Sequence, residues 1–176
     1  MQSLPALSGQ ALKWTQPKAS KMEYELHAGD QIAATLRFRS SFGSFATAES
    51  AEGCWTFKRV GFWQTKVTVR ACDSDSDIAT FVNNTWSGGG TLTLPDDRKL
   101  LVSTNMWQTK YEIKSESETS LVRYSMGGML RLSSEVEILP AALDLPELPW
   151  LVTLGWYLAI LAYMDTTAAS TVAIVT

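Results

Sequence analysis

Apolar and polar residues alternate along most of the chain, and this alternation ends near residue 138. Between residues 21 and 39, for example, Tyr24, Leu26 and Leu36 are each followed or preceded by a charged residue such as Glu25 or Arg37. Successive side chains of a β-strand point to opposite faces, so a period of two predicts half-buried strands. This pattern predicts strands near 11–15, 21–27, 31–39, 44–49, 54–60, 65–71, 78–83, 90–94, 98–103, 106–114, 119–125 and 129–138.

The last part of the chain has a different pattern. From 150 to 164 the residues are apolar on every side of a helix, and Asp165 is the only charged residue between 148 and 176. Such a helix is either a membrane span or the buried centre of a protein. This run would be about 22 Å long, which is shorter than a hydrocarbon core of roughly 30 Å. Neither Lys nor Arg flanks it, and Asp165 would lie in or near the hydrocarbon.

Together the two patterns predict one compact arrangement. About twelve antiparallel strands close into a barrel that is wider than its own side chains can fill, and a central helix can occupy the interior. We therefore predict a mainly β, single-domain protein over 1–176. Its strands form a closed antiparallel barrel over about 11–139, around a buried hydrophobic helix over about 147–165. The pattern leaves open whether 166–176 continue the helix, form a strand or form a tail.

A second interpretation keeps the membrane span. In it, residues 148–166 are a transmembrane helix that anchors a separate β-domain at its C-terminal end. Residues 1–10 contain no basic region followed by an apolar one, so we expect no signal peptide. Cys54 and Cys72 could pair, but two cysteines in 176 residues are not a disulfide framework. We interpret both as small core or surface residues, and we expect a reducing, cytoplasmic location.

The charge distribution argues against nucleic acid as a partner. The net charge is −3, and all Lys and Arg residues lie between Lys13 and Arg131. Within that region, basic side chains alternate with apolar ones and should point outward from a barrel. They form a candidate face for an anionic ligand, such as an anionic membrane lipid or an acidic protein partner. Its residues are Arg37, Arg39, Lys66, Arg70, Lys110 and Lys114.

One short sequence occurs twice. The residues Trp-Gln-Thr-Lys occupy both 63–66 and 107–110, each followed by an alternating segment. We interpret the two copies as strands in equivalent places of a barrel, with the tryptophans facing the core. The alternative is a doubled basic surface for an anionic partner.

No catalytic or metal-binding pattern is complete. Asp73-Ser-Asp75-Ser-Asp77 begins like a calcium loop, but Ile78 and Asn84 stand where such a loop has Gly and Glu. A solvated turn fits better. His27, the only histidine, should lie on the surface before a turn, with no nucleophile motif near it. The Ser-Gly-Gly-Gly run at 87–90 lacks the Lys of a phosphate loop and fits a flexible turn. We expect no catalytic residues, no metal and no cofactor, and therefore not an enzyme.

This layout resembles the tubby C-terminal-like superfamily, which includes the LURP-one-related proteins and the phospholipid scramblases. The local resemblance lies in Trp-Thr-Phe-Lys-Arg at 55–59, in Gly-Thr-Leu-Thr-Leu-Pro-Asp-Asp at 90–97, and above all in Leu-Pro-Glu-Leu-Pro-Trp-Leu-Val-Thr-Leu-Gly-Trp-Tyr-Leu at 145–158. It extends from about residue 13 to 165. It implies a barrel with a buried helix, often cytoplasmic and membrane-associated.

The functional residues of that superfamily do not carry over. Tubby proteins bind phosphoinositides, but no position here matches their head-group motif. Scramblases carry an acidic calcium-binding segment before the helix and palmitoylated cysteines. Here residues 133–144 contain no clustered Asp-x-Asp ligand set, and the chain has no cysteine cluster. We therefore expect a non-enzymatic scaffold or binding module. It would bind anionic phospholipid head groups as a cytoplasmic protein, peripheral at the membrane.

Overall fold

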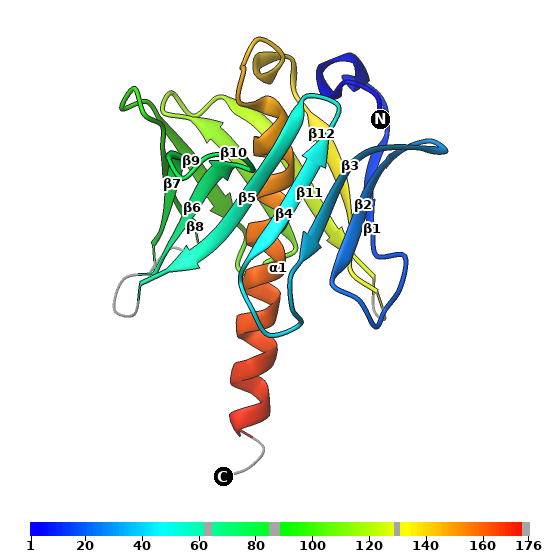
Figure 1. Ribbon diagram of the computed structural model, residues 1–176, viewed down its shortest axis with the longest axis vertical. Helices are drawn as coiled ribbons and strands as arrows, with labels where there is room; N and C mark the ends of the chain where they lie inside the picture. Colours follow the sequence, from blue (N-terminus) through cyan, green and yellow to red (C-terminus); the bar gives the residue numbers. More distant parts are fainter. Residues whose placement is uncertain (62–64, 85–88, 129–130, 174–176) are drawn as a thin grey trace.

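The computed structural model describes residues 1–61, 65–84, 89–128 and 131–173. Within them, β-strands dominate and the one α-helix comes last (Figure 1). The elements are η1 (Leu4–Leu7), β1 (Leu12–Thr15), β2 (Glu23–Ala28), β3 (Gln31–Phe38), β4 (Ala46–Ser50), β5 (Gly53–Val60), β6 (Lys66–Ala71), β7 (Asp77–Asn84), β8 (Gly89–Thr93), β9 (Lys99–Thr104), β10 (Lys110–Ser115), β11 (Ser120–Gly127), β12 (Ser133–Ile138), η2 (Pro140–Ala142) and α1 (Leu148–Ala173).

The strands form one closed barrel, as the alternation predicts. Each strand pairs antiparallel with its neighbours in sequence, and β1 closes the sheet by pairing with β12. In that last pair Leu12 lies opposite Val136, and Trp14 lies opposite Ser134. Buried and more exposed positions alternate along β2 and β12, so the apolar set faces the interior. The predicted fold class, a twelve-stranded antiparallel barrel around a C-terminal helix, is confirmed.

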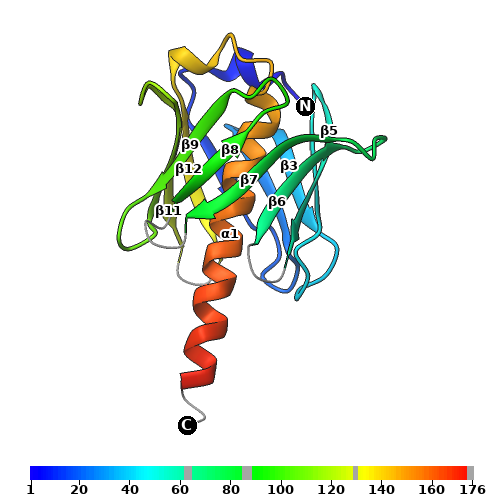
Figure 2. The ribbon, with the colours of Figure 1, turned by 90° about the vertical axis from the view of Figure 1, so that its left-hand side faces the viewer.

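Helix α1 runs through the centre of the barrel and extends beyond it (Figures 1 and 2). Residues 148–161 are buried. By length and composition alone this helix could cross a membrane. However, 78% of its apolar 18-residue stretch is buried inside the barrel. The helix continues past the predicted end at 165 to Ala173, which resolves the open question for 166–173 in favour of helix. Residues 174–176 lie outside the described part of the chain.

A tyrosine fixes the position of α1 inside the sheet. The Tyr124 hydroxyl on β11 donates to the helix carbonyls of Leu151 and Val152, at 3.1 and 3.0 Å. Its ring needs the space that Gly155 leaves, because a Cβ there would lie 2.4 Å from the ring and the hydroxyl. Further along the helix, Trp156 stacks on Trp14 with ring centroids 6.0 Å apart. These contacts fix the apolar part of the helix inside the barrel.

Two predicted strands begin too early. The strand predicted from 106 begins at Lys110, because Asn105 makes a turn. Its Oδ1 accepts the backbone N–H groups of Thr109 and Lys110 at 2.8 and 3.0 Å, and Gln108 has a φ of 53°. In the strand predicted over 129–138, residues 129–130 lie outside the described part of the chain, and β12 begins at Ser133.

The turn at Asn105 also corrects the interpretation of the repeated sequence. Trp107 lies in that turn and is exposed rather than in the core. In the first copy, Trp63 and Gln64 fall outside the described residues.

The prediction that the two cysteines stay unpaired is wrong. Cys54 and Cys72 form a disulfide, with Cα atoms 5.4 Å apart. Cys54 is the second residue of β5 and Cys72 follows the last residue of β6, so the hairpin places them side by side. The Cys72 N–H donates to the Cys54 carbonyl at 3.1 Å. The signal was present in the sequence, since both cysteines border the same predicted hairpin.

Candidate functional site at the helix exit

The barrel has two unlike ends. Because consecutive strands are antiparallel, their connections alternate between the end where α1 begins and the end where it leaves (Figure 1). We define the start rim as residues 29–30, 51–52, 72–76, 94–98, 116–119 and 139–147. We define the exit rim as the described connecting residues at the other end, namely 16–22, 39–45, 61, 65, 105–109, 128 and 131–132.

Charge is divided between the two rims. On the start rim every charged residue except Arg98 is acidic: Asp30, Glu52, Asp73, Asp75, Asp96, Asp97, Glu116, Glu118, Asp144 and Glu147. On the exit rim every charged residue is basic: Lys18, Lys21, Arg39 and Arg131. Lys66 and Lys110, the first residues of β6 and β10, extend this basic collar. Glu23, the first residue of β2, adds one carboxylate to it, 3.6 Å from Lys21. The molecule is therefore polarised along the barrel axis.

Exposed apolar side chains also gather at the exit rim. Phe42, in the β3–β4 connection, is 99% exposed, and Trp107, in the β9–β10 connection, is 79% exposed beside the exposed Met106. Tyr163, on α1 where it leaves the barrel, is 47% exposed. Among large hydrophobic residues in the described ranges, Met1 is the only other one with this degree of exposure. Scattered apolar residues need no explanation, but a cluster at one end indicates an interaction surface.

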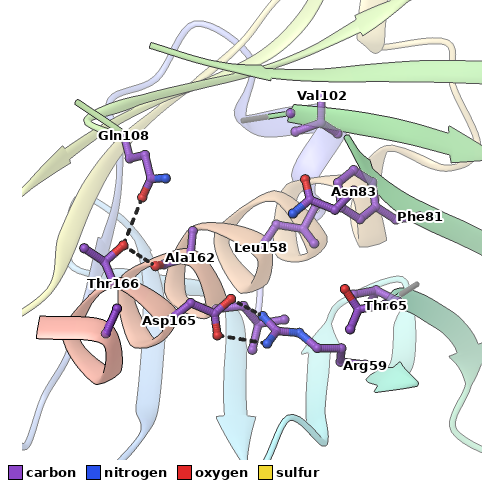
Figure 3. Close-up of a pocket in the computed structure, with 14 residues that line it drawn as sticks. Arg59, Thr65, Phe81, Asn83, Val102, Gln108, Leu158, Ala162, Asp165 and Thr166 are labelled. Atoms are coloured by element: carbon purple, nitrogen blue, oxygen red, sulfur yellow. Dashed lines mark hydrogen bonds and ion pairs between the residues drawn. The ribbon is translucent and has the colours of Figure 1, made fainter. Parts of the chain in front are cut away.

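Contacts with α1 hold these connections in place. The Tyr157 hydroxyl donates to the Ser44 carbonyl, next to the segment that carries Phe42. The Thr166 hydroxyl lies 3.4 Å from Oε1 of Gln108, which neighbours Trp107 (Figure 3). Burial raises the pKa of Tyr157 far above its usual value, so its hydroxyl stays protonated and remains a donor at neutral pH.

A two-point ion pair joins the helix to the barrel wall at the same level. The Arg59 guanidinium on β5 donates to both Asp165 carboxylate oxygens, at 2.9 and 2.8 Å (Figure 3). Asp165 carries the one charge on α1. A single buried charge would be costly, but here the carboxylate lies at the mouth and has a partner.

Beside this ion pair a cavity of about 460 Å³ opens between α1 and the strands β6 to β9. Its walls change from polar to apolar with depth. β6 runs from the exit end into the barrel and β7 runs back to it. Thr65 and Asn83 therefore lie near the mouth of the cavity, whereas Val67 and Phe81 lie deeper. The remaining lining residues are Arg59, Gly89, Val102, Gln108, Leu158, Leu161, Ala162, Asp165, Thr166 and Ala169.

The six basic residues predicted to form one face do not lie together. They belong to or border β3, β6 and β10, and at least two other strands separate each pair of these strands in the barrel. Arg37 pairs with Glu49 at 3.7 Å and Arg70 pairs with Asp77 at 2.6 Å. Arg39, Lys66 and Lys110 instead lie at the exit end, where they encircle the opening.

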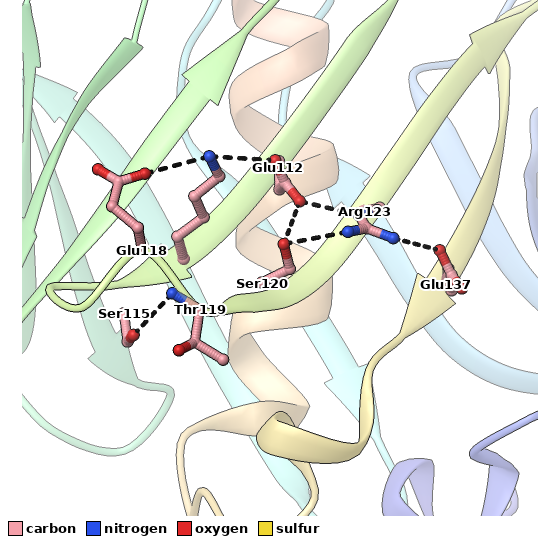
Figure 4. Close-up of polar contacts among 8 residues, drawn as sticks. Glu112, Ser115, Glu118, Thr119, Ser120, Arg123 and Glu137 are labelled. Carbon is pink, nitrogen blue, oxygen red and sulfur yellow. Dashed lines mark hydrogen bonds and ion pairs between the residues drawn. The ribbon is translucent and has the colours of Figure 1, made fainter.

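Lys114 belongs to a network of charged side chains with Glu112, Glu118 and Arg123. Figure 4 labels the last three of these residues. Its Nζ lies 3.5 Å from Glu112 and 3.2 Å from Glu118. Glu112 also accepts from Ser120 and Arg123. Partial burial raises the pKa of Glu112, but these hydrogen bonds and the nearby Lys114 and Arg123 charges outweigh it and leave the pKa below its usual value. This network has its positive charges satisfied, so it offers little to an anionic ligand.

The other candidates show no catalytic arrangement in the described residues. Asp73, Asp75 and Asp77 lie at the start end, and Asp77 already binds Arg70. The described part of the chain contains no group of three or more potential metal ligands. His27 lies near the end of β2, before the turn as predicted, but it is partly buried and 3.1 Å from Glu25. In the glycine run, Gly89 and Gly90 begin β8, whereas Ser87 and Gly88 fall outside the described ranges.

Sequence reasoning missed the apolar and polarised character of the exit rim. The signal was the order of the connections, since alternate connections in an antiparallel barrel share one end.

In comparisons with known proteins, the chain matches no protein-family profile, no curated protein and no solved structure.

Proposed function

We propose that this protein is a non-enzymatic binding module of tubby-like fold that docks on anionic phospholipid head groups through its exit rim. The proposal rests on the shared location of two features. The basic connections and the exposed apolar side chains occupy the same end of the barrel, around the protruding end of α1.

Electrostatics would orient the molecule on such a surface. Each Lys or Arg close to an anionic bilayer contributes about 1 kcal/mol at moderate salt. Arg39, Lys66 and Lys110 lie on different sides of the opening, so a surface that admits the protruding end of α1 could contact all three at once. The acidic start rim would be repelled and would point away from the membrane.

Apolar contacts would add to this attraction. Aromatic side chains such as Phe42 and Trp107 partition into the interface between head groups and acyl chains. The helix contributes as well, because no charged residue follows Asp165 and the turns after it are rich in Ala and Thr. Shallow insertion of this end would leave the buried part of α1 inside the barrel.

Two further proposals concern the partner and the location of the protein. An acidic protein surface is the alternative partner, because it presents the same charge as anionic lipid. The cytoplasmic, peripheral location is the second. The Cys54–Cys72 disulfide argues against a cytoplasmic location, since structural disulfides are rare in a reducing cytoplasm.

The test is co-sedimentation of the full chain with vesicles of phosphatidylcholine, with and without phosphatidylglycerol. We expect binding to the anionic vesicles at low salt, and weaker binding as salt screens the charges. Binding of similar strength to both vesicle types would leave only the apolar part of the proposal. No sedimentation with anionic vesicles at low salt would refute it.

The membrane-spanning alternative is favoured by the length and composition of α1. It requires residues 148–161 to leave the barrel and expose its apolar interior. An alkaline carbonate wash of membranes from cells that express the chain separates the two functions. A docked module is released by the wash, and a spanning protein is retained.

A further inference from the structure

The cavity beside the Arg59–Asp165 ion pair has the features of a ligand site. Its volume of about 460 Å³ lies within the range of roughly 300–1,000 Å³ that is usual for small-molecule sites. Its deep part is apolar, formed by Phe81, Val102 and Leu158. The first two side chains are buried strand residues, and Leu158 is buried on α1. An apolar recess of this kind can bind hydrocarbon.

The mouth of the cavity has a different chemistry. Arg59, Asn83 and Gln108 line it and can donate N–H groups. Arg59 holds the carboxylate of Asp165, whose side chain is 60% exposed. A ligand anion that reached the guanidinium would therefore compete with one solvent-accessible carboxylate, and would not have to enter a buried charge network.

We infer that this cavity binds a single-chain anionic amphiphile, with its head group on Arg59 and its alkyl chain against Phe81, Val102 and Leu158. The head group takes the place of the Asp165 carboxylate, and the chain follows the helix inward. A fatty acid and a lysophospholipid share this chemistry. The cavity opens at the rim that we propose faces the membrane, but the inference does not require membrane docking.

Two substitutions on α1 separate this site from its surroundings. Ala162 lines the cavity, and a phenylalanine there would occupy the space needed by the chain. Ala168 lies six residues further along the helix and lines a different cavity, on the side of Phe42. Ala162→Phe is therefore the test variant and Ala168→Phe is its matched control.

The experiment is calorimetric titration of the full chain, without vesicles, with sodium dodecanoate below its micellar concentration. Dodecyltrimethylammonium serves as the cationic probe with the same chain length. We expect dodecanoate to bind at least about tenfold more tightly than the cation. Ala162→Phe should weaken dodecanoate binding by about tenfold or more, whereas Ala168→Phe should leave it unchanged.

Asp165→Asn gives the sharper result, because it removes the competing carboxylate. It should tighten dodecanoate binding by about threefold or more and leave the affinity for the cation no higher. An ion pair that only sealed the barrel would give no such gain. Equal binding in Ala162→Phe and wild type, a preference for the cation, or no binding of dodecanoate would each overturn the inference.

A second titration identifies the source of the ligand. Dodecanoyl lysophosphatidylglycerol that binds as well as dodecanoate supports a site for lipid-derived amphiphiles with a large head group. Binding of dodecanoate alone supports a site for free fatty acids. Since no bilayer is present, success here together with failure to sediment with vesicles would refute only the membrane docking.

Discussion

The start rim and the exit rim of the barrel differ in packing, cross-links and exposure. At the start rim, η1 and η2 bury Leu4, Leu7 and Ala142, and the Cys54–Cys72 disulfide joins two strands. Arg98 bridges Asp96 and Glu147 there. At the exit rim, Phe42 and Trp107 are exposed and cavities open beside the helix. One end is therefore closed by buried residues and cross-links, whereas the other exposes apolar and basic side chains.

Removing the disulfide should have the largest effect on stability. Cys54→Ala combined with Cys72→Ala releases a loop with a sequence separation of 18 residues. A cross-link of that span contributes about 3 kcal/mol, chiefly by restricting the unfolded chain. Urea unfolding should show this loss in the double variant, and wild type with reductant should behave alike. A wild-type midpoint that reductant does not move would show that the cysteines are unpaired in solution.

Alkaline pH should weaken the barrel interior next. Burial, with a smaller contribution from Tyr163, raises the pKa of Tyr24 to about 12. Burial also raises the pKa values of Tyr124 and Tyr157. A raised folded-state pKa means that the stability is fully present below the unfolded value of about 10 and is lost as pH rises further.

For Tyr24 the loss should reach roughly 2 kcal/mol by about pH 12. The measurement is urea unfolding at several alkaline pH values, with tyrosinate absorbance recorded in parallel. Tyr24→Phe should reduce the pH dependence. Full tyrosine ionisation near pH 10, without unfolding, would contradict the packing around α1.

Gly155→Ala tests the contact between α1 and β11. The new Cβ would lie 2.4 Å from the buried Tyr124 ring, so the helix or the strand must shift. Overpacking of this kind costs about 1–3 kcal/mol, which outweighs the helix preference of alanine. Gly127→Ala is the control, because its Cβ would meet Ser133 Oγ at an ordinary 3.5 Å. Equal stability of the two variants would show that α1 is not fixed against Tyr124.

Phe42→Ser combined with Trp107→Ser should have the smallest effect on stability and a large one on binding. Both side chains are exposed, so the free energy of unfolding should stay within about 0.5 kcal/mol of wild type. Affinity for phosphatidylglycerol-containing vesicles should fall by about tenfold or more, because two interfacial aromatic residues are lost. Unchanged vesicle affinity would mean that attraction to the surface is purely electrostatic.

The fold could be predicted from the sequence because its two periodic patterns are strong. Period two is clear in strands such as β2 and β12, and the segment around Trp156 is apolar on all sides. The errors arose where local chemistry overrides the pattern. The Asn105 side chain accepts backbone hydrogen bonds that form a turn, so Trp107 does not belong to a strand. Strand propensity does not reveal such hydrogen bonds. The disulfide required the pairing of two strands, which a count of cysteines cannot provide.

The candidate site was harder to predict than the fold. In the sequence, Arg37 and Lys114 alternate with apolar residues just as Arg39 and Lys110 do. Only the strand order shows that the first two form ion pairs on the barrel wall and that the last two lie at the exit end. The Arg59–Asp165 contact joins residues 106 positions apart. Its prediction would need the depth and rotation of α1 inside the barrel, which side-chain packing determines.

The most direct test of the docking claim compares one charge reversal at each end. Arg39→Glu at the exit rim and Lys99→Glu, which follows the start rim, change the net charge equally. Vesicle co-sedimentation at low salt should show a loss of affinity for phosphatidylglycerol-containing vesicles in Arg39→Glu, with Lys99→Glu close to wild type. Equal losses in the two variants would mean that only net charge matters, and would contradict docking through the exit rim.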